Sequence, residues 1–92
     1  MNKRDIIYQA LVEECRQCLD KVKGTEREAW LKIRSENDRT LMQSFGPFTK
    51  SVAERAGISS ATVSYHLSKD GRVESENPGA GTCRRWWAKG VK

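Results

Sequence analysis

The chain lacks the marks of several large protein classes. No run of residues is long and apolar enough to cross a membrane, and the charges near the N-terminus are followed by polar residues rather than by the apolar core of a signal peptide. The cysteine count, three, is odd, which indicates free thiols rather than a disulfide framework. These absences predict a protein of the reducing cytoplasm.

Side chains for acid–base or phosphate chemistry are also scarce. The chain has one histidine, His66, and it has neither a glycine-rich phosphate loop nor a cluster of carboxylates. Its acidic residues are spread along the predicted helices, as solvated surface charges are. We therefore expect no enzymatic activity and no cofactor.

Proline and glycine are nearly missing from the first half of the chain. No proline precedes Pro47, and Gly24 is the one glycine before Gly46. Apolar residues recur with helical spacing over residues 3–23, which predicts one amphipathic helix that Gly24 ends. Thr25 and Glu28 have the spacing of a capping box, which predicts the start of a second helix that runs to residue 44. The apolar stripe of the first helix comprises Ile6, Ile7, Ala10, Leu11, Cys15, Cys18, Leu19 and Val22.

The second half contains the most informative stretch, residues 48–71. It predicts two short helices joined by a sharp turn at Gly57, with Ser59 capping the second helix. Val63 and Leu67 lie on the face of the second helix that points back toward the first. The inward positions of the first helix and the turn are Val52, Ala53, Ala56 and Ile58. The outer face of the second helix, Ser60, Ala61, Ser64, Tyr65 and Ser68, has no acid that would repel phosphates.

The sequence VAERAGISSATVSYHL, at residues 52–67, resembles the helix-turn-helix of the lac repressor family, whose pattern is V-A-x-x-A-G-[IV]-S-x-x-T-V-S. The resemblance covers about twenty residues, under a quarter of the chain. It implies that the helix over residues 59–69 enters the major groove of DNA. In that arrangement Ser60, Ala61 and Tyr65 reach base edges, Thr62 and Ser64 hydrogen-bond phosphates, and His66 and Lys69 reach the flank. We add Thr49 and Ser59, the hydroxyl residues at the two helix starts, to the expected DNA contacts.

At two of the positions expected to reach base edges, this chain has side chains that recognise bases weakly. Ser60 and Ala61 are short and cannot form the bidentate pairs that Arg, Asn or Gln make with bases. The sequence therefore predicts strong salt dependence and much indirect readout of DNA shape.

Two short strand candidates, residues 72–77 and 82–88, follow the second helix around a turn that contains Pro78. With Pro47 and Phe48 as a short first strand, this order is similar to winged-helix regulators such as the small pili-operon regulators and the MarR-like and ArsR-like groups. The similarity implies a wing over residues 72–89. Strand alternation puts Trp86 and Trp87 on opposite faces, so we expect at most one of them in the core.

The charge is unevenly placed along the chain. Residues 1–46 hold nine basic and eight acidic side chains, whereas residues 47–92 hold eight and four, within a net charge of +5. Residues 82–92 contain four basic side chains and no acid. A basic wing beside a recognition helix predicts phosphate binding by Arg72, Arg84 and Arg85, along the backbone or in the minor groove, and double-stranded DNA as the partner.

Together these features predict one domain over residues 1–92, mainly α with a small β-hairpin: a winged helix-turn-helix preceded by an extra N-terminal helix. The helix over residues 25–44 would be the first helix of that unit. The helix over residues 1–24 would be surplus, and it either pads the core or pairs with a second copy; we favour a homodimer, because most DNA regulators bind two half-sites. The expected function is transcription regulation by a small bacterial or phage protein.

Two other functions stay open. The paired tryptophans and the N-terminal stripe also suit a winged-helix adaptor that binds proteins, such as an antirepressor or a polymerase-binding factor. Alternatively, a basic hairpin carrying Trp86 and Trp87 suits stacking on single-stranded nucleic acid or RNA.

A zinc site is the metal alternative. Cys15 and Cys18 have metal-like spacing and, with Cys83 and His66, make a possible Cys3His set. Both cysteines fall on the apolar stripe of a regular helix, however, whereas zinc knuckles place such a pair in a turn. We therefore expect no metal and predict buried free thiols.

Overall fold

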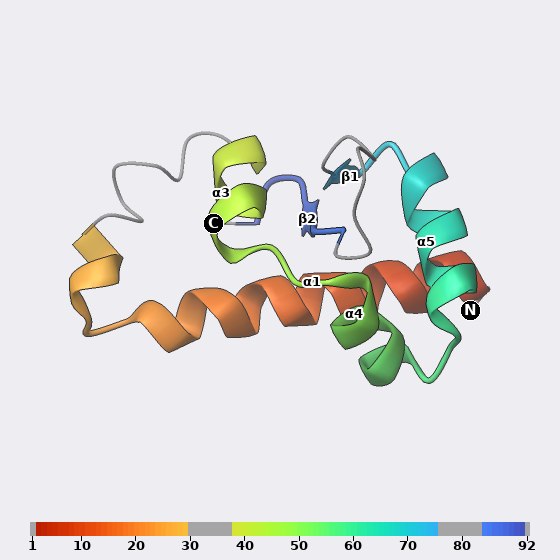
Figure 1. The fold of residues 1–92 in the computed structure, drawn as a ribbon, viewed down its shortest axis with the longest axis horizontal. Coiled ribbons are helices and arrows are strands. Elements are labelled where there is room, and N and C mark those ends of the chain that lie inside the picture. The colour runs from red at the N-terminus through yellow and green to blue at the C-terminus, as the bar shows by residue number, and fades with distance from the viewer. Residues whose placement is uncertain (1, 30–37, 76–83, 92) are drawn as a thin grey trace.

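The computed structural model describes residues 2–29, 38–75 and 84–91 (Figure 1). In chain order, the long helix α1 (Lys3–Val22) is followed by the short helices α3 (Asp38–Phe45), α4 (Thr49–Ala56) and α5 (Ser60–Lys69), and then by the strands β1 (Val73–Ser75) and β2 (Trp86–Ala88). The two strands pair antiparallel, with Val73 opposite Ala88 and Ser75 opposite Trp86. The prediction of a mainly helical fold with a small hairpin is confirmed.

Local signals set the two ends of α1. The side chain of Asn2 accepts a hydrogen bond from the Asp5 N–H at 2.9 Å and so caps the start of the helix. Gly24, at a φ of 76°, takes the left-handed conformation that follows the helix end. The predicted bounds of this helix are confirmed to within a residue or two.

The predicted capping box is wrong in its bonding. Thr25 Oγ1 donates to the Val22 carbonyl at 2.6 Å, and Glu28 Oε2 accepts from the Gly24 N–H at 2.8 Å. Both side chains therefore close the end of α1, because the carbonyls and turn amides there lack other partners. Residues 26–29 are helical and α3 ends at Phe45, next to Gly46 and Pro47; residues 30–37 of the predicted second helix lie outside the described residues.

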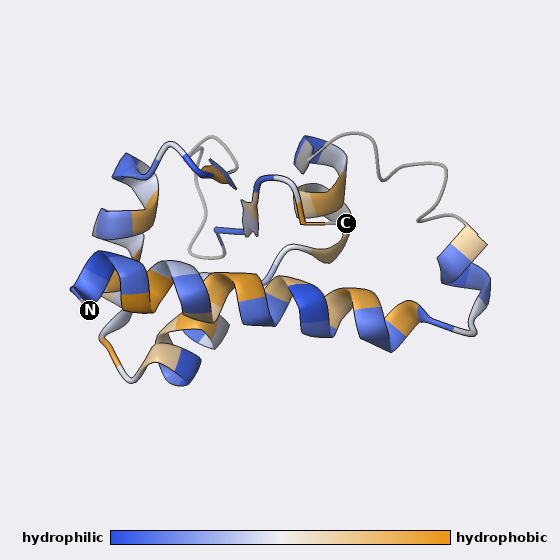
Figure 2. Ribbon diagram, turned by 180° about the vertical axis from the view of Figure 1, so that it is seen from behind, coloured by the Kyte–Doolittle hydropathy of each residue, from blue (hydrophilic) through white to orange (hydrophobic). Residues whose placement is uncertain are grey.

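The apolar stripe of α1 is used inside the chain. Helix α1 packs against α4, β2 and α5, and its hydrophobic residues recur along the side that faces them (Figure 2). Cys18 is half-buried and Ile6 is 37% exposed. The buried residues of α1 are Ile7, Ala10, Leu11, Val12, Cys15, Leu19 and Val22. The sequence left two roles open for the stripe, filling the core or pairing with a second copy. In the structure it fills the core, so a homodimer through the stripe would require these residues to leave the core.

The order of helix packing also differs from the prediction. Helix α1 packs with α4 and α5, a place that the prediction gave to the helix over residues 25–44, of which residues 30–37 lie outside the described residues. Helix α3 lies instead against β1 and β2 and, to a smaller extent, α1. Length is one reason: the twenty residues of α1 span about 30 Å and reach along both α4 and α5.

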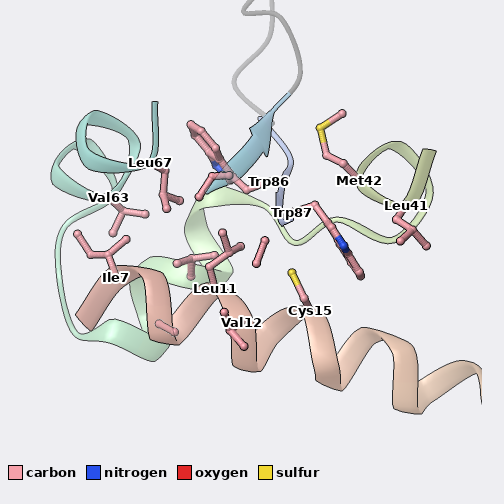
Figure 3. Close-up of a cluster of buried hydrophobic side chains, with 14 of the residues drawn as sticks. Ile7, Leu11, Val12, Cys15, Leu41, Met42, Val63, Leu67, Trp86 and Trp87 are labelled. Carbon is pink, nitrogen blue, oxygen red and sulfur yellow. The ribbon is translucent and has the colours of Figure 1, made fainter. Parts of the chain in front are cut away.

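Both tryptophans of β2 are fully buried, so the prediction that at most one enters the core is wrong. Figure 3 shows Trp86 on the side of Leu67 from α5, and Trp87 on the side of Leu41 and Met42 from α3. The alternation itself holds, but α3 covers the face of the hairpin that would otherwise meet solvent. Each indole N–H has a partner: Trp86 Nε1 donates to Thr49 Oγ1 at 2.8 Å, and Trp87 Nε1 donates to the Val91 carbonyl at 3.0 Å.

The segment before α4 joins the edge of the hairpin. Phe48 forms an isolated antiparallel bridge with Arg85, and the Trp86 N–H donates to the Pro47 carbonyl at 3.1 Å. The predicted first strand is thus one bridge. Residues 76–83 of the two predicted strands lie outside the described residues. None of the helices in the described part of the chain has the length and apolar character needed to cross a membrane.

Candidate nucleic-acid interface

A sharp turn presents α5 at the surface. Gly57 follows α4 with a φ of 68°, and its N–H donates to the Ala53 carbonyl at 2.9 Å. The hydroxyl of Ser59 then accepts from the Thr62 N–H at 3.4 Å, at the start of α5. Val63 and Leu67 are buried, as their spacing predicts. The local geometry predicted over residues 48–71 is therefore confirmed from the caps to the inward positions.

The outer face of α5 is polar, open to solvent and free of acid. Tyr65 is its most prominent side chain, at 56% exposed. Ser64, Thr62 and His66 are half-buried along its flanks. The exposed positions of this helix are Ser60, Ala61, Tyr65, Ser68 and Lys69. We call this surface the α5 face.

Tyr65 is oriented by its neighbours on the helix. Lys69 Nζ donates to the Tyr65 hydroxyl at 3.0 Å and lies 4.3 Å from the ring centroid. This hydrogen bond and the positive charge of Lys69 lower the pKa of Tyr65. The His66 ring meets the Tyr65 ring edge-on at a centroid distance of 5.3 Å. The α5 face thus presents an aromatic ring with a cation held against it.

Several polar atoms of the predicted contact residues are engaged within the protein. Ser59 Oγ donates to Thr62 Oγ1 at 2.9 Å, so these two hydroxyls are paired. Ser68 Oγ donates to the Tyr65 carbonyl at 2.9 Å. His66 Nδ1 is buried and makes no hydrogen bond to any residue that the structure describes, so this nitrogen does not face the flank of α5.

Thr49 has an internal role. Its hydroxyl accepts from Trp86 Nε1 at 2.8 Å and lies 3.4 Å from the Arg84 carbonyl, to which it donates. Its N–H donates to the same carbonyl at 3.2 Å. The hydroxyl and the N–H of Thr49, which the prediction assigned to DNA, are therefore both bonded to the segment at β2.

Arg72 is also committed within the chain. Its guanidinium makes two hydrogen bonds to Asp70, at 3.0 and 2.8 Å, and lies 3.8 Å from Asp5 Oδ1. It stacks 3.9 Å from the ring centroid of Tyr8. These bonds lower the pKa of Asp70. The predicted phosphate contact by Arg72 would require breaking this arrangement, whose main effect is to tie the segment after α5 to α1.

The two arginines at the base of the hairpin lie on aromatic rings. The Arg84 guanidinium is 4.6 Å from the Trp86 ring centroid, with Nη2 3.5 Å from Ser75 Oγ, and that of Arg85 is 4.8 Å from the Phe48 centroid. Stacking thus holds both guanidinium groups in place at the base of the hairpin.

The cysteines behave as structural thiols. Cys15 is fully buried, and burial raises its pKa to about 12. Burial also raises the pKa of Cys18, which is half-buried. In residues 2–29, 38–75 and 84–91 no three His, Cys, Asp or Glu side chains come together as metal ligands would, and Cys83 lies outside these ranges. Buried free thiols are confirmed for Cys15 and only partly for Cys18.

Sequence reasoning missed one element of this region, the first turns of α1. The N-terminus of the chain lies beside α5 (Figure 1), and Asp5 and Tyr8 hold Arg72 just after that helix. No local pattern signals this neighbourhood, because it arises from packing between residues far apart in the sequence. The α5 face thus borders a second helix, as well as the hairpin.

Comparisons of the chain with protein-family models, with curated proteins and with solved structures found no significant match. A function is therefore argued from the surface itself. That surface consists of the α5 face, the arginines at the base of the hairpin and the first turns of α1.

Proposed function

We propose that this chain binds double-stranded DNA as a winged helix-turn-helix protein, with α5 in the major groove. The observation that carries the proposal is the α5 face: a ten-residue helix, held out by a sharp turn, that is free of acid and centred on an exposed tyrosine. An α-helix with its side chains is about 10–12 Å in diameter and so fits a major groove about 12 Å wide.

The order of elements after α5 supports the same proposal. An antiparallel hairpin follows this helix, and a bridge from Phe48 adds a short third segment at its edge. This is the order expected of a winged helix, with α1 as the helix that packs on α4 and α5. Helix α3 is then the additional element, and it covers the hairpin.

Each part of the surface has a distinct role in the proposal. The short side chains of Ser60 and Ala61 allow α5 to approach the base edges closely, and Tyr65 contacts a thymine methyl or a base edge. Thr62 and Ser64 bond phosphates from the flanks. Arg84 and Arg85 lie along the backbone or in a narrow minor groove.

The biological setting belongs to the same proposal. We infer a small transcription regulator of the cytoplasm that acts without enzymatic chemistry. A homodimer on two half-sites stays a prediction, and its interface would be a surface other than the buried stripe of α1.

The features that suggested the two alternative functions, binding of single-stranded nucleic acid and binding of proteins as an adaptor, are buried in the structure. Stacking on single-stranded bases needs exposed rings, but Trp86 and Trp87 are both buried. An adaptor that binds proteins through these tryptophans or through the stripe of α1 meets the same difficulty. Competition of a labelled duplex with single-stranded DNA and RNA distinguishes single-strand binding from duplex binding, and a pull-down without DNA tests the adaptor.

Salt dependence tests the proposal directly. We expect duplex binding through about two to four phosphate contacts, which corresponds to a slope of log K against log salt of about −2 to −3.5. The measurement is titration of a fluorescent duplex at several salt concentrations between roughly 50 and 200 mM. An absence of binding, or an affinity that salt leaves unchanged, would rule the proposal out.

Tyr65→Ala and Arg84→Ala test separately the preference for a DNA sequence and the overall affinity for DNA. We expect Tyr65→Ala to lower the preference for a selected duplex over a scrambled one about three- to tenfold, since it removes a contact to bases. Arg84→Ala weakens both duplexes alike, because phosphates carry no sequence information. The measurement is the ratio of the two dissociation constants for each variant. Uniform loss of affinity in both variants would contradict this division of roles.

A further inference from the structure

The start of α1 is fixed beside the C-terminal end of α5. The guanidinium of Arg72 stacks on Tyr8, lies 3.8 Å from Asp5 and makes two hydrogen bonds to Asp70, directly after α5. The first two turns of α1 and the segment directly after α5 are therefore joined through the side chain of Arg72.

Arg4 is the basic residue that this arrangement brings toward the α5 face. Arg4 lies four residues before Tyr8, and therefore on the side of α1 that holds Arg72 after α5. In addition, its positive charge adds to the effect of Lys69 that lowers the pKa of Tyr65, and to the effect of Arg72 that lowers the pKa of Asp70. The side chain is exposed and makes no hydrogen bond or ion pair with any residue of the described ranges. Arg4 thus lies close to the proposed readers without being held by them.

The other cations around this end of α5 already have partners. Arg72 is neutralised by Asp70 and Asp5, and Lys89 Nζ donates to the Gly71 carbonyl at 3.3 Å. Lys69 is bonded to the Tyr65 hydroxyl. A cation that must first break an internal ion pair gains less from a phosphate than one that only releases its counterions. By that criterion Arg4 is better suited to a phosphate than Arg72.

We propose that Arg4 binds a DNA phosphate beside the groove that α5 occupies, so that α1 contributes to the grip on DNA as well as to the core. This inference rests on the proposed function. It replaces Arg72 by Arg4 among the phosphate contacts, and it extends the interface from the α5 face across to a helix at the other end of the sequence. Lys69 then holds the hydroxyl of Tyr65, while Arg4 binds the phosphate.

The test compares three variants in duplex titrations over the same range of salt. We expect Arg4→Ala to reduce the steepness of the salt dependence by about 0.9, the value of one phosphate contact. It should weaken selected and scrambled duplexes alike, roughly two- to fivefold near 0.1 M salt. Arg4→Lys keeps the charge and should retain most of the slope.

Arg16→Ala is the matched control. Arg16 lies on the same helix, is exposed and has no hydrogen bond or ion pair with a described residue, but it is about 18 Å farther along α1. We expect its slope and affinity to equal those of the unchanged chain. Alanine favours helix at both positions, so thermal melting should show both variants folded.

The outcomes separate the inference from the proposed function. Duplex binding that depends on salt, with the same slope for Arg4→Ala as for the unchanged chain, overturns the role of Arg4 and leaves duplex binding standing. Equal losses for Arg4→Ala and Arg16→Ala also overturn it, because they indicate a general charge effect. No duplex binding by the unchanged chain overturns both.

Discussion

Trp87→Ala is expected to lower the free energy of unfolding by about 3–5 kcal/mol. Trp87 is fully buried between Cys15 of α1 and the Leu41–Met42 side of α3 (Figure 3). Removing its indole leaves a large cavity that the short helix α3 cannot close, and it leaves the Val91 carbonyl without its 3.0 Å partner. Chemical denaturation followed by circular dichroism measures the effect.

Tyr65→Ala is the control for this experiment. Tyr65 is aromatic but 56% exposed, and we expect its loss to change the stability by no more than about 0.5 kcal/mol. A loss for Trp87→Ala as small as that of Tyr65→Ala would mean that Trp87 faces solvent. In that case α3 would not cover the hairpin.

Gly46→Ala is expected to cost about 3 kcal/mol, because it places a methyl group between two backbone segments. A Cβ at this position would lie 2.8 Å from the Trp86 carbonyl oxygen and even closer to that of Met42. Neither oxygen belongs to a flexible side chain, so relief requires α3 and β2 to move apart. Denaturation midpoints of the two proteins measure the loss.

Gly71→Ala supplies the comparison within the same chain. A Cβ at Gly71 meets no atom within 4 Å, and its φ is not in the left-handed region. We therefore expect it to be neutral to within about 0.5 kcal/mol. If Gly46→Ala is equally mild, the close approach of α3 to β2 in the structure is wrong.

Local signals were enough to place the helices of the second half. Gly57 and Ser59 mark the turn and the start of α5, since a left-handed backbone and a hydroxyl cap depend on neighbouring atoms alone. Val63 and Leu67 follow from helical periodicity in the same way. The exposed α5 face was predictable for that reason.

Residues that meet across the fold were not predictable. Thr49 and Arg72 are residue types that commonly contact DNA. In the structure, however, the hydroxyl of Thr49 accepts a hydrogen bond from the Trp86 indole. The guanidinium of Arg72 is held by Asp70, Asp5 and Tyr8. Except for that of Arg72 with Asp70, these partnerships join residues distant in the sequence, whose approach no spacing rule describes. Charge and hydroxyl content indicate a candidate interface, but they do not identify which of its members are already engaged.

The sequence by itself determined the helix ends, the turn before α5 and the inward and outward faces of that helix, because caps and periodicity act within a few residues. Only the tertiary structure decided that α1 packs with α4 and α5, that α3 covers the hairpin and that both tryptophans are buried. The physical reason is that each of several amphipathic segments can cover the same apolar surface. Which one does so depends on its length and on close approaches such as that of Gly46, which appear only when the chain is assembled.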